Sequence, residues 1–206
     1  MSVYAVGITG GSGAPYALRL LQVLLASGHE VHLVITPAGE TVLQIECGVK
    51  LGKTLREKTA AMATAIETEH GACLRLFDPQ NLAAPISSGS FACAGMVIVP
   101  CSTGTLGRIA NGISSNLIER AADVMLKERR RLVVVPRETP LNEIHLRNML
   151  TLRQAGADIL PAMPAFYHKP RHIADLIDMI VGRVLDRLGV ENELFHRWGG
   201  DAPAED

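Results

Sequence analysis

Glycine and hydroxyl residues gather at four points of the sequence, each directly after an apolar run. The segments are residues 9–13 (TGGSG), 36–37 (TP), 101–105 (CSTGT) and 137–139 (RET). Small side chains leave backbone N–H groups accessible, and hydroxyls add further donors. A phosphate ester is bound by such convergent donors at helix N-termini. These segments therefore predict a site for a phosphate-bearing ligand.

The apolar runs before these segments predict β-strands that alternate with helices. The predicted strands are residues 4–9, 30–36, 73–77, 95–100, 132–135 and 158–160. The predicted helices are residues 16–27, 37–46, 53–68, a helical region from about 105 to 128, 142–155 and 171–188, with a loop over 79–90. This alternation is typical of an α/β protein with a parallel sheet. The carboxyl ends of such strands meet at one edge, so the four segments should lie together.

Three familiar motifs match only in part. Residues 7–13 (GITGGSG) lack the G-x-G-x-x-G pattern, and the second strand ends at Thr36 instead of an acid, which disfavours a dinucleotide but not a mononucleotide. Residues 48–54 (GVKLGKT) have one residue too few between their glycines for a phosphate-binding Walker loop. Residues 10–14 (GGSGA) lack the closing glycine of a nucleophile elbow, which disfavours a serine hydrolase.

Composition and charge exclude several classes of protein. The 206 residues include 20 Lys+Arg and 21 Asp+Glu, so the net charge of −1 gives no overall field for nucleic acid or an anionic membrane. The charged fraction of 20% lies below the roughly 25% of average domains, which suggests further surface hidden in a homo-oligomer. No run approaches the roughly 18 apolar residues of a membrane span, so no membrane insertion is expected.

The same reading predicts one domain in the cytoplasm. We find no internal repeat and no linker that would divide residues 1–206, and the N-terminus has no basic leader. The four cysteines form no C-x-x-C pair, so neither a disulfide framework nor a structural zinc site is indicated. His168 and His172 are spaced like metal ligands on a helix, but Pro170 between them disfavours a metal site.

Six blocks of the sequence are similar to one known family. They are residues 7–14 (GITGGSGA), 87–90 (SSGS), 100–106 (PCSTGTL), 119–130 (ERAADVMLKERR), 136–140 (PRETP) and 164–168 (PAFYH). Over residues 6–198 the chain resembles the UbiX-type flavin prenyltransferases, formerly labelled aromatic-acid decarboxylases. The resemblance implies a Rossmann-like, three-layer α/β/α fold with a mainly parallel sheet. It also implies FMN, no metal, and a homododecamer with the flavin at subunit contacts.

The resemblance further implies a reaction. A dimethylallyl group would pass from dimethylallyl monophosphate to reduced FMN, first at N5 and then at the neighbouring ring carbon C6. The product, prenylated FMN, would serve a partner UbiD-type decarboxylase. Two alternatives stay open: a flavin-dependent cysteine decarboxylase, although no histidine stands between His32 and His70 where that class needs one, and an FMN-binding module without catalysis.

The matched blocks also imply roles for individual residues. The resemblance assigns flavin contacts to Gly10, Gly11, Ser12, Thr36, Ser102, Thr103, Gly104, Thr105, Arg120 and Arg137. It assigns the prenyl phosphate to Tyr167, Arg183, Lys127 and Arg137. It assigns catalytic roles to Ser12 near N5, to Glu46 and Glu138 in positioning or proton relay, to Lys127 at the leaving phosphate, and to Trp198 in a tail, residues 190–206, that closes the pocket.

Several of these residues also have plain structural interpretations. Ser12 could cap the helix that follows it, and Arg137 and Glu138 could form a surface ion pair. Trp198 could simply anchor the tail by burial, and Lys127 could belong to a solvated helix end. Gly11 and Thr36 stand where the family more often has alanine and serine, which leaves the loop geometry in question.

Overall fold

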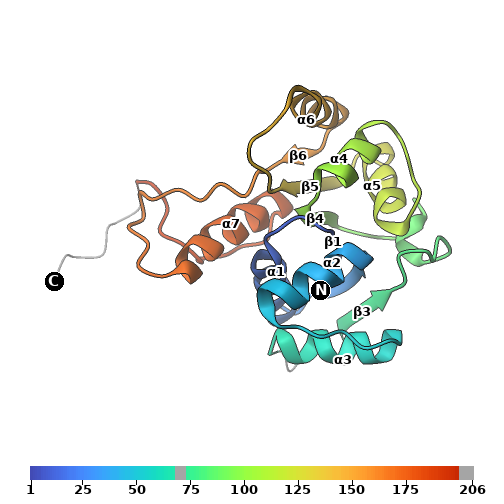
Figure 1. Cartoon of the computed structure of the whole chain (residues 1–206), viewed down its shortest axis with the longest axis horizontal. Coiled ribbons are helices and arrows are strands. Elements are labelled where there is room, and N and C mark those ends of the chain that lie inside the picture. The colour runs from blue at the N-terminus through green and yellow to red at the C-terminus, as the bar shows by residue number, and fades with distance from the viewer. Residues whose placement is uncertain (68–72, 200–206) are drawn as a thin grey trace.

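The protein is built on a six-stranded sheet in which every pair of neighbouring strands is parallel (Figure 1). The structure, a computed structural model, describes residues 1–67 and 73–199. The strands are β1 (Val3–Ile8), β2 (Glu30–Ile35), β3 (Leu74–Phe77), β4 (Gly95–Cys101), β5 (Arg131–Pro136) and β6 (Asp158–Ile159). Their order, β3-β2-β1-β4-β5-β6, is that of the Rossmann fold, which confirms the predicted fold class.

Helices cover both faces of the sheet. They are α1 (Ala14–Ala26), α2 (Pro37–Cys47), α3 (Leu55–Ala65), α4 (Thr103–Ala110), α5 (Leu117–Lys127), α6 (Glu143–Ala155) and α7 (Ile173–Leu188). Helices α1 and α7 pack together on one face, and α4 and α5 pack on the other. No described helix has both the length and the apolar character that crossing a membrane requires.

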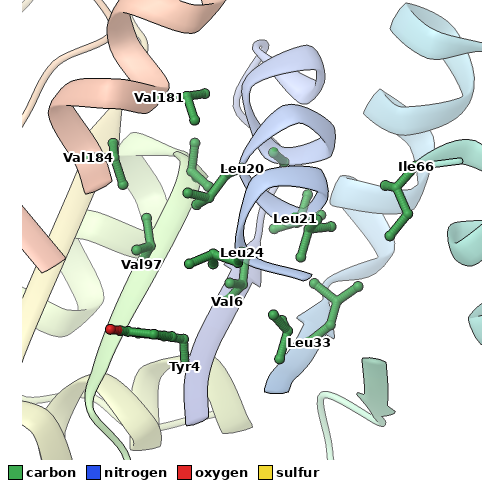
Figure 2. Close-up of a cluster of buried hydrophobic side chains, with 14 of the residues drawn as sticks. Tyr4, Val6, Leu20, Leu21, Leu24, Leu33, Ile66, Val97, Val181 and Val184 are labelled. Atoms are coloured by element: carbon green, nitrogen blue, oxygen red, sulfur yellow. The ribbon is translucent and has the colours of Figure 1, made fainter. Parts of the chain in front are cut away.

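Alternate residues of the central strands are buried in two separate cores: the first lies under α1 and α7, and the second under α4 and α5. In β1, Tyr4, Val6 and Ile8 are buried against α1, while Ala5 faces the core under α4 and α5. Figure 2 shows Leu20, Leu21 and Leu24 of α1 over Val6, among other side chains of the first core. Such two-sided burial is typical of parallel sheets.

The strand order places a crevice at the middle of the sheet. Neighbours β1 and β4 are followed by helices on opposite faces, α1 and α4, so their carboxyl ends open between two helix N-termini. Open α/β sheets bind ligands at such a point. The two longest predicted ligand segments, residues 9–13 and 101–105, both lie there.

Three predicted elements differ in detail. The helical region up to 128 is interrupted at 111–116, where Gly112 has a φ of 69° and Asn116 caps the start of α5. The predicted helix 53–68 is α3, and its expected last residue, Thr68, lies outside the described residues. The predicted loop 79–90 contains a short 3-10 helix, Pro85–Ser87, and residues 200–206 of the predicted tail are also outside the described part.

Candidate functional site

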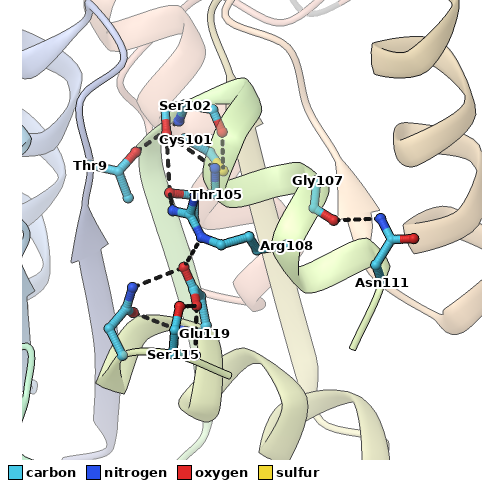
Figure 3. Close-up of polar contacts among 10 residues, drawn as sticks. Thr9, Cys101, Ser102, Thr105, Gly107, Arg108, Asn111, Ser115 and Glu119 are labelled. Carbon is cyan, nitrogen blue, oxygen red and sulfur yellow. Dashed lines mark hydrogen bonds and ion pairs between the residues drawn. The ribbon is translucent and has the colours of Figure 1, made fainter. Parts of the chain in front are cut away.

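Thr9 joins the two central strands at the crevice. Its hydroxyl donates to the carbonyl oxygen of Pro100 at 2.8 Å. The same hydroxyl accepts the backbone N–H of Ser102 at 2.7 Å (Figure 3). The residue is only 1% exposed. One buried side chain therefore fixes the end of β1 against the start of α4.

The first turn of α4 is held by its own hydroxyl groups. Ser102 caps the helix by accepting the N–H of Thr105 at 3.3 Å, and the Ser102 hydroxyl donates to that of Thr105 at 3.0 Å. The N–H groups of Thr103 and Gly104 precede the first intrahelical hydrogen bond, so this turn has donors left for a ligand. An anion is favoured at such a helix N-terminus.

The ion pair of Arg108 with the buried carboxylate of Glu119 stabilises this first turn of α4. Arg108 donates from Nη2 to the Thr105 hydroxyl at 3.2 Å and from Nε to the carboxylate of Glu119, which is fully buried. Ser115 and Asn116 also donate to this carboxylate. Burial alone would raise the pKa of Glu119, but the hydrogen bonds from Ser115 and Arg108 outweigh it and lower the pKa below its ordinary value.

The start of α1 is held by a carboxylate from another helix. Glu46, near the end of α2, accepts the N–H groups of Gly13 at 2.9 Å and Ala14 at 2.8 Å. Burial acts to raise the pKa of Glu46, but hydrogen bonds from Ser12, Gly13 and Ala14 bring the pKa below its ordinary value. Since these N–H groups are occupied, the helix starts at the crevice that keep free N–H donors are those of α2 and α4.

The glycines of the first loop have different tasks. A Cβ on Gly10 would lie 2.7 Å from the Cβ of Ala38, so only glycine allows α2 to approach this loop. A Cβ on Gly11 would meet Cys101 and Pro100 at 3.4 Å, an ordinary contact. The loop geometry therefore accommodates either glycine or alanine at position 11.

Thr36 begins α2 in the same way that Ser102 begins α4. Its hydroxyl accepts the N–H of Gly39 at 3.1 Å, and its backbone N–H donates to the carbonyl oxygen of Ile8 at 3.0 Å. The cap on α2 uses only the side-chain hydroxyl, which threonine and serine share. Threonine therefore fulfils the capping role that serine would have at this position.

Arg137 reaches the same loop from β5. Its Nε donates to the carbonyl oxygen of Ser12 at 3.2 Å. Its charge also acts on Tyr16: burial raises the pKa of the Tyr16 phenol, and Arg137 offsets part of that rise. Glu138 is half-buried beside it, and both residues line a pocket of about 220 Å³ whose remaining walls are mainly apolar.

Tyr167, Arg183 and Trp198 belong to a second cluster, near α7. The rings of Tyr167 and Trp198 meet edge to face with centroids 5.5 Å apart. Asp186 pairs with Arg183 at 3.9 Å and accepts two hydrogen bonds from Arg197, which fastens the tail to α7. In Figure 1 the loop before α7 and the chain after it lie together at the left of the molecule. Trp198 is 81% exposed, so the described tail does not bury this ring within the chain.

Lys127 lies apart from Arg137, and Arg120 is engaged with residues outside the predicted site. Lys127 ends α5, just before the amino end of β5, whereas Arg137 follows the carboxyl end of the same strand. The six residues of β5 span roughly 17 Å. Lys127 pairs with Glu128, and Arg120 donates to the carbonyl oxygen of Ser87 and to Asp123. A single chain therefore does not bring Lys127 to Arg137.

Three residues of the site did not emerge from the sequence. Thr9 was predicted only as part of its loop, and Tyr16 and Arg108 were not predicted at all. Arg108 carries a usable signal, since it stands three residues after Thr105 and thus on the same helix face. Tyr16 carries none, because only the fold brings Arg137 next to it.

The residues at the crevice fit a phosphorylated flavin. Gly10 lets α2 pack closely against the first loop, Gly11 faces the end of β4, and the starts of α2 and α4 offer hydroxyl and N–H donors. Within the described residues, no three side chains of the metal-binding types lie close enough to hold a metal ion. The chemistry of this donor set is that of a site for a phosphate ester and a polar ring.

Comparison with known proteins decides the family. A family model described as Flavoprotein matches residues 3–185. A relative from Halalkalibacterium halodurans, named flavin prenyltransferase UbiX, is 52% identical over 199 residues, which cover 96% of this chain and 93% of the relative. The chain belongs to the UbiX flavin prenyltransferases. Members of this family are transferases that act on a flavin, and FMN is the flavin of this UbiX chain.

Solved structures agree with this UbiX assignment. The crystal structure of AnUbiX (PadA1) in complex with FMN and dimethylallyl pyrophosphate has a TM-score of 0.85 at 42% identity, covering 98% of this chain and 99% of that one. A dodecameric, FMN-dependent Ubix-like decarboxylase from Escherichia coli O157:H7 has a TM-score of 0.82 at 41% identity, covering 96% and 100%. A PPC decarboxylase shares only the fold, with 17% identity and a TM-score of 0.61. Prenyl transfer to a flavin is therefore the reaction class.

Proposed function

We propose that this chain transfers a dimethylallyl group from dimethylallyl monophosphate to N5 and C6 of reduced FMN. The observation that carries the proposal is the meeting of the starts of α2 and α4 with Arg137 at one edge of the sheet. Hydroxyl and N–H groups there suit the flavin and its phosphate, and a guanidinium suits a second anion beside it. When bound and reduced, FMN supplies the nucleophilic nitrogen and ring carbon.

The flavin would be held by residues from three loops. Gly10, Gly11, Thr36 and the turn of Ser102, Thr103, Gly104 and Thr105 provide a narrow surface rich in donors. Ser12 lies in the same loop, and its side chain helps to lower the pKa of the Glu46 carboxylate. In this arrangement Ser12 holds or passes a proton near flavin N5, and Glu46 fixes the direction of the Ser12 hydroxyl.

The prenyl phosphate would be bound by cations and closed in by the tail. Arg137 and Arg183 neutralise the phosphate as its bond to the allylic carbon breaks, and the Tyr167 hydroxyl donates to it. Trp198 presents an aromatic face that stabilises positive charge developing on the allyl group. Glu138 positions groups at the reacting centre, and the departing phosphate accepts a released proton.

The complete site would need a second copy of the chain. Lys127 is exposed at the end of α5, at the other end of β5 from Arg137, so it would reach a flavin bound beside Arg137 across a subunit contact. A dodecameric Ubix-like homologue supports a homo-oligomer of that size for this protein. Exposed apolar side chains on α6, Ile144, Leu146 and Leu150, are consistent with such contacts.

The direct test is anaerobic incubation of the protein with reduced FMN and either dimethylallyl monophosphate or the pyrophosphate. We expect the flavin mass to rise by one dimethylallyl group, and NMR of the product to place the new bonds at N5 and C6. Tyr167→Phe keeps the ring contact with Trp198 and should slow the transfer. Bound but unchanged flavin would favour the non-catalytic FMN-binding module instead.

The product should serve a UbiD-type decarboxylase. Adding the reaction mixture to such a decarboxylase in its cofactor-free form should restore decarboxylation, whereas FMN alone should not. The proposal also includes one domain over residues 1–206 and a cytoplasmic location, which suits four cysteines that are all free thiols.

A further inference from the structure

Arg108 has no place in the function described so far, yet it is tied to the flavin loops through a short series of hydrogen bonds. Its Nη2 donates to the Thr105 hydroxyl at 3.2 Å, and that hydroxyl also accepts from Ser102 at 3.0 Å. The N–H of Ser102 then donates to Thr9 at 2.7 Å. Figure 3 shows these side chains in a line from Glu119 up to Thr9.

The other end of this line is rigid. The carboxylate of Glu119 is fully buried and accepts hydrogen bonds from Arg108, Ser115 and Asn116. The backbone N–H of Glu119 donates back to Asn116 at 3.0 Å. A carboxylate fixed by so many donors holds the guanidinium in one orientation, because Arg108 donates to it through a charge-assisted bond.

The ion pair of Arg108 and Glu119 has a defined orientation relative to α4. The negative end, Glu119, lies in the protein interior, whereas the positive end, Arg108, faces the first turn of α4. The Arg108 side chain is 41% exposed, so its charge is not enclosed. A Cβ on Gly104 would lie 3.5 Å from Nη1 of Arg108, which places the guanidinium alongside that turn.

We propose that Arg108 is a positioning residue for FMN: it fixes the hydroxyls of Thr105 and Ser102, and its pairing with the buried carboxylate of Glu119 holds its positive charge toward the flavin site. Arg108 itself touches no reacting atom. The inference rests on the proposed binding of FMN at the first turn of α4. Arginine only donates, so the Thr105 oxygen always accepts from it, and the cap on α4 keeps one geometry.

A purely structural role would give a different result. Arg108 also fastens α4 to α5, and removing it leaves a buried carboxylate with one donor fewer, which destabilises a protein. Removing both charges together avoids that penalty. The double variant Arg108→Met with Glu119→Gln therefore separates the stability of the fold from the affinity for FMN.

The experiment uses the full chain in five forms: wild type, Arg108→Met, Arg108→Lys, Glu119→Gln and the double variant. Arg147→Met is the matched control, because Arg147 forms an exposed pair with Glu143 on α6. The melting temperature of each flavin-free protein reports the fold. The Kd for FMN, and the KM for FMN compared with kcat for prenyl transfer, report the site.

We expect the double variant to melt close to the wild type and yet bind FMN about tenfold more weakly, as loss of a hydrogen bond and a nearby charge implies. Its kcat at saturating FMN should stay near that of the wild type. Arg108→Lys should restore part of the affinity, and Glu119→Gln should keep it. A double variant whose Kd lies within twofold of the wild type overturns the inference. If the wild type itself fails to bind FMN, the proposed function fails instead.

Discussion

The carboxylate of Glu46, near the end of α2, accepts the backbone N–H of Gly13 at the start of α1 at 2.9 Å. Thirty-three positions separate the two residues in the sequence. The contact fills an anion site that α1 would otherwise offer to a ligand. It also ties the glycine loop to the helix that carries Thr36 at its other end.

Replacing Glu46 should loosen this loop. Glu46→Ala removes the acceptor of two N–H groups, and we expect a loss of about 0.5–1 kcal/mol in the free energy of unfolding, as for other helix caps. Glu46→Gln keeps one acceptor oxygen and should lose less. Urea denaturation at pH 7 measures both. Equal stability of all three proteins would show that the contact adds nothing in solution.

The difference in the free energy of unfolding between wild type and Glu46→Ala should depend on pH, because the pKa of Glu46 is lowered in the folded protein. The carboxylate has a lower pKa when folded than its ordinary value of 4.5, so its stabilisation is fully present above that pH. The stabilisation is lost as the pH falls through the folded pKa. The gap between wild type and Glu46→Ala should therefore narrow between pH 7 and pH 3, and a constant gap would assign it to packing.

Thr9→Val should lower the free energy of unfolding, because it removes the hydroxyl that joins the ends of β1 and β4. Valine has nearly the same shape but removes the acceptor of the Ser102 N–H, while the carbonyl oxygen of Pro100 keeps only the backbone N–H of residue 9. We expect a loss of about 1–2 kcal/mol in the free energy of unfolding. Thr9→Ser keeps the hydroxyl and serves as the control. Chemical denaturation measures both, and a loss in Thr9→Ser as large as that in Thr9→Val would contradict the role of the hydroxyl.

Gly10→Ala and Gly11→Ala form a matched pair. At position 10 the new methyl would lie 2.7 Å from Ala38, so α2 must move; we expect about tenfold weaker FMN binding, from an overpacking cost of about 1–3 kcal/mol. At position 11 the contact is ordinary, and affinity should stay near that of the wild type. Fluorescence titration with FMN tests the pair, and the reverse ranking would contradict the geometry.

Trp198→Ala should affect catalysis more than folding. The ring is 81% exposed, so the free energy of unfolding should change by less than about 1 kcal/mol. Losing an aromatic face beside a developing cation should slow prenyl transfer roughly tenfold. Trp198→Phe keeps a smaller face and should lie between. A wild-type rate in the alanine variant would remove the tail from the reaction.

Cys101 should resist alkylation in the folded protein. Burial raises the pKa of its thiol to about 12, so at pH 8 only about one thiol in ten thousand is the reactive thiolate. Peptide mass spectrometry after iodoacetamide treatment, with and without urea, measures this. Cys101 should be modified only in urea, and modification of the folded protein would indicate that β4 and α4 separate readily.

The sequence predicted the fold well because its signals are local. Apolar runs and glycine or proline boundaries located all six strands, and the predicted strand 4–9 differs from β1, Val3–Ile8, by one residue at each end. The interruption at 111–116 was missed because its flanks are equally good helix formers. Only Gly112, with its positive φ, and the Asn116 cap separate α4 from α5.

The site was harder to predict because its geometry is not local. Hydroxyl-rich segments after the strands did converge, as parallel strands require. The contact of Glu46 with Gly13 depends on the crossing of α2 over α1, which no spacing reveals. Lys127 and Arg137, ten positions apart in the sequence, lie at opposite ends of β5, so a list of cations alone suggests one cluster where the chain has two.

The edges of the sheet set a further condition on how copies of the chain meet. The outer strands β3 and β6 have only four and two residues, and such short edges offer few unpaired backbone groups to a neighbour. Contacts between copies must then use side chains on helices and loops. Many molecules can thus gather at high concentration without their sheets joining into a continuous ribbon, which protects a crowded assembly from aggregation.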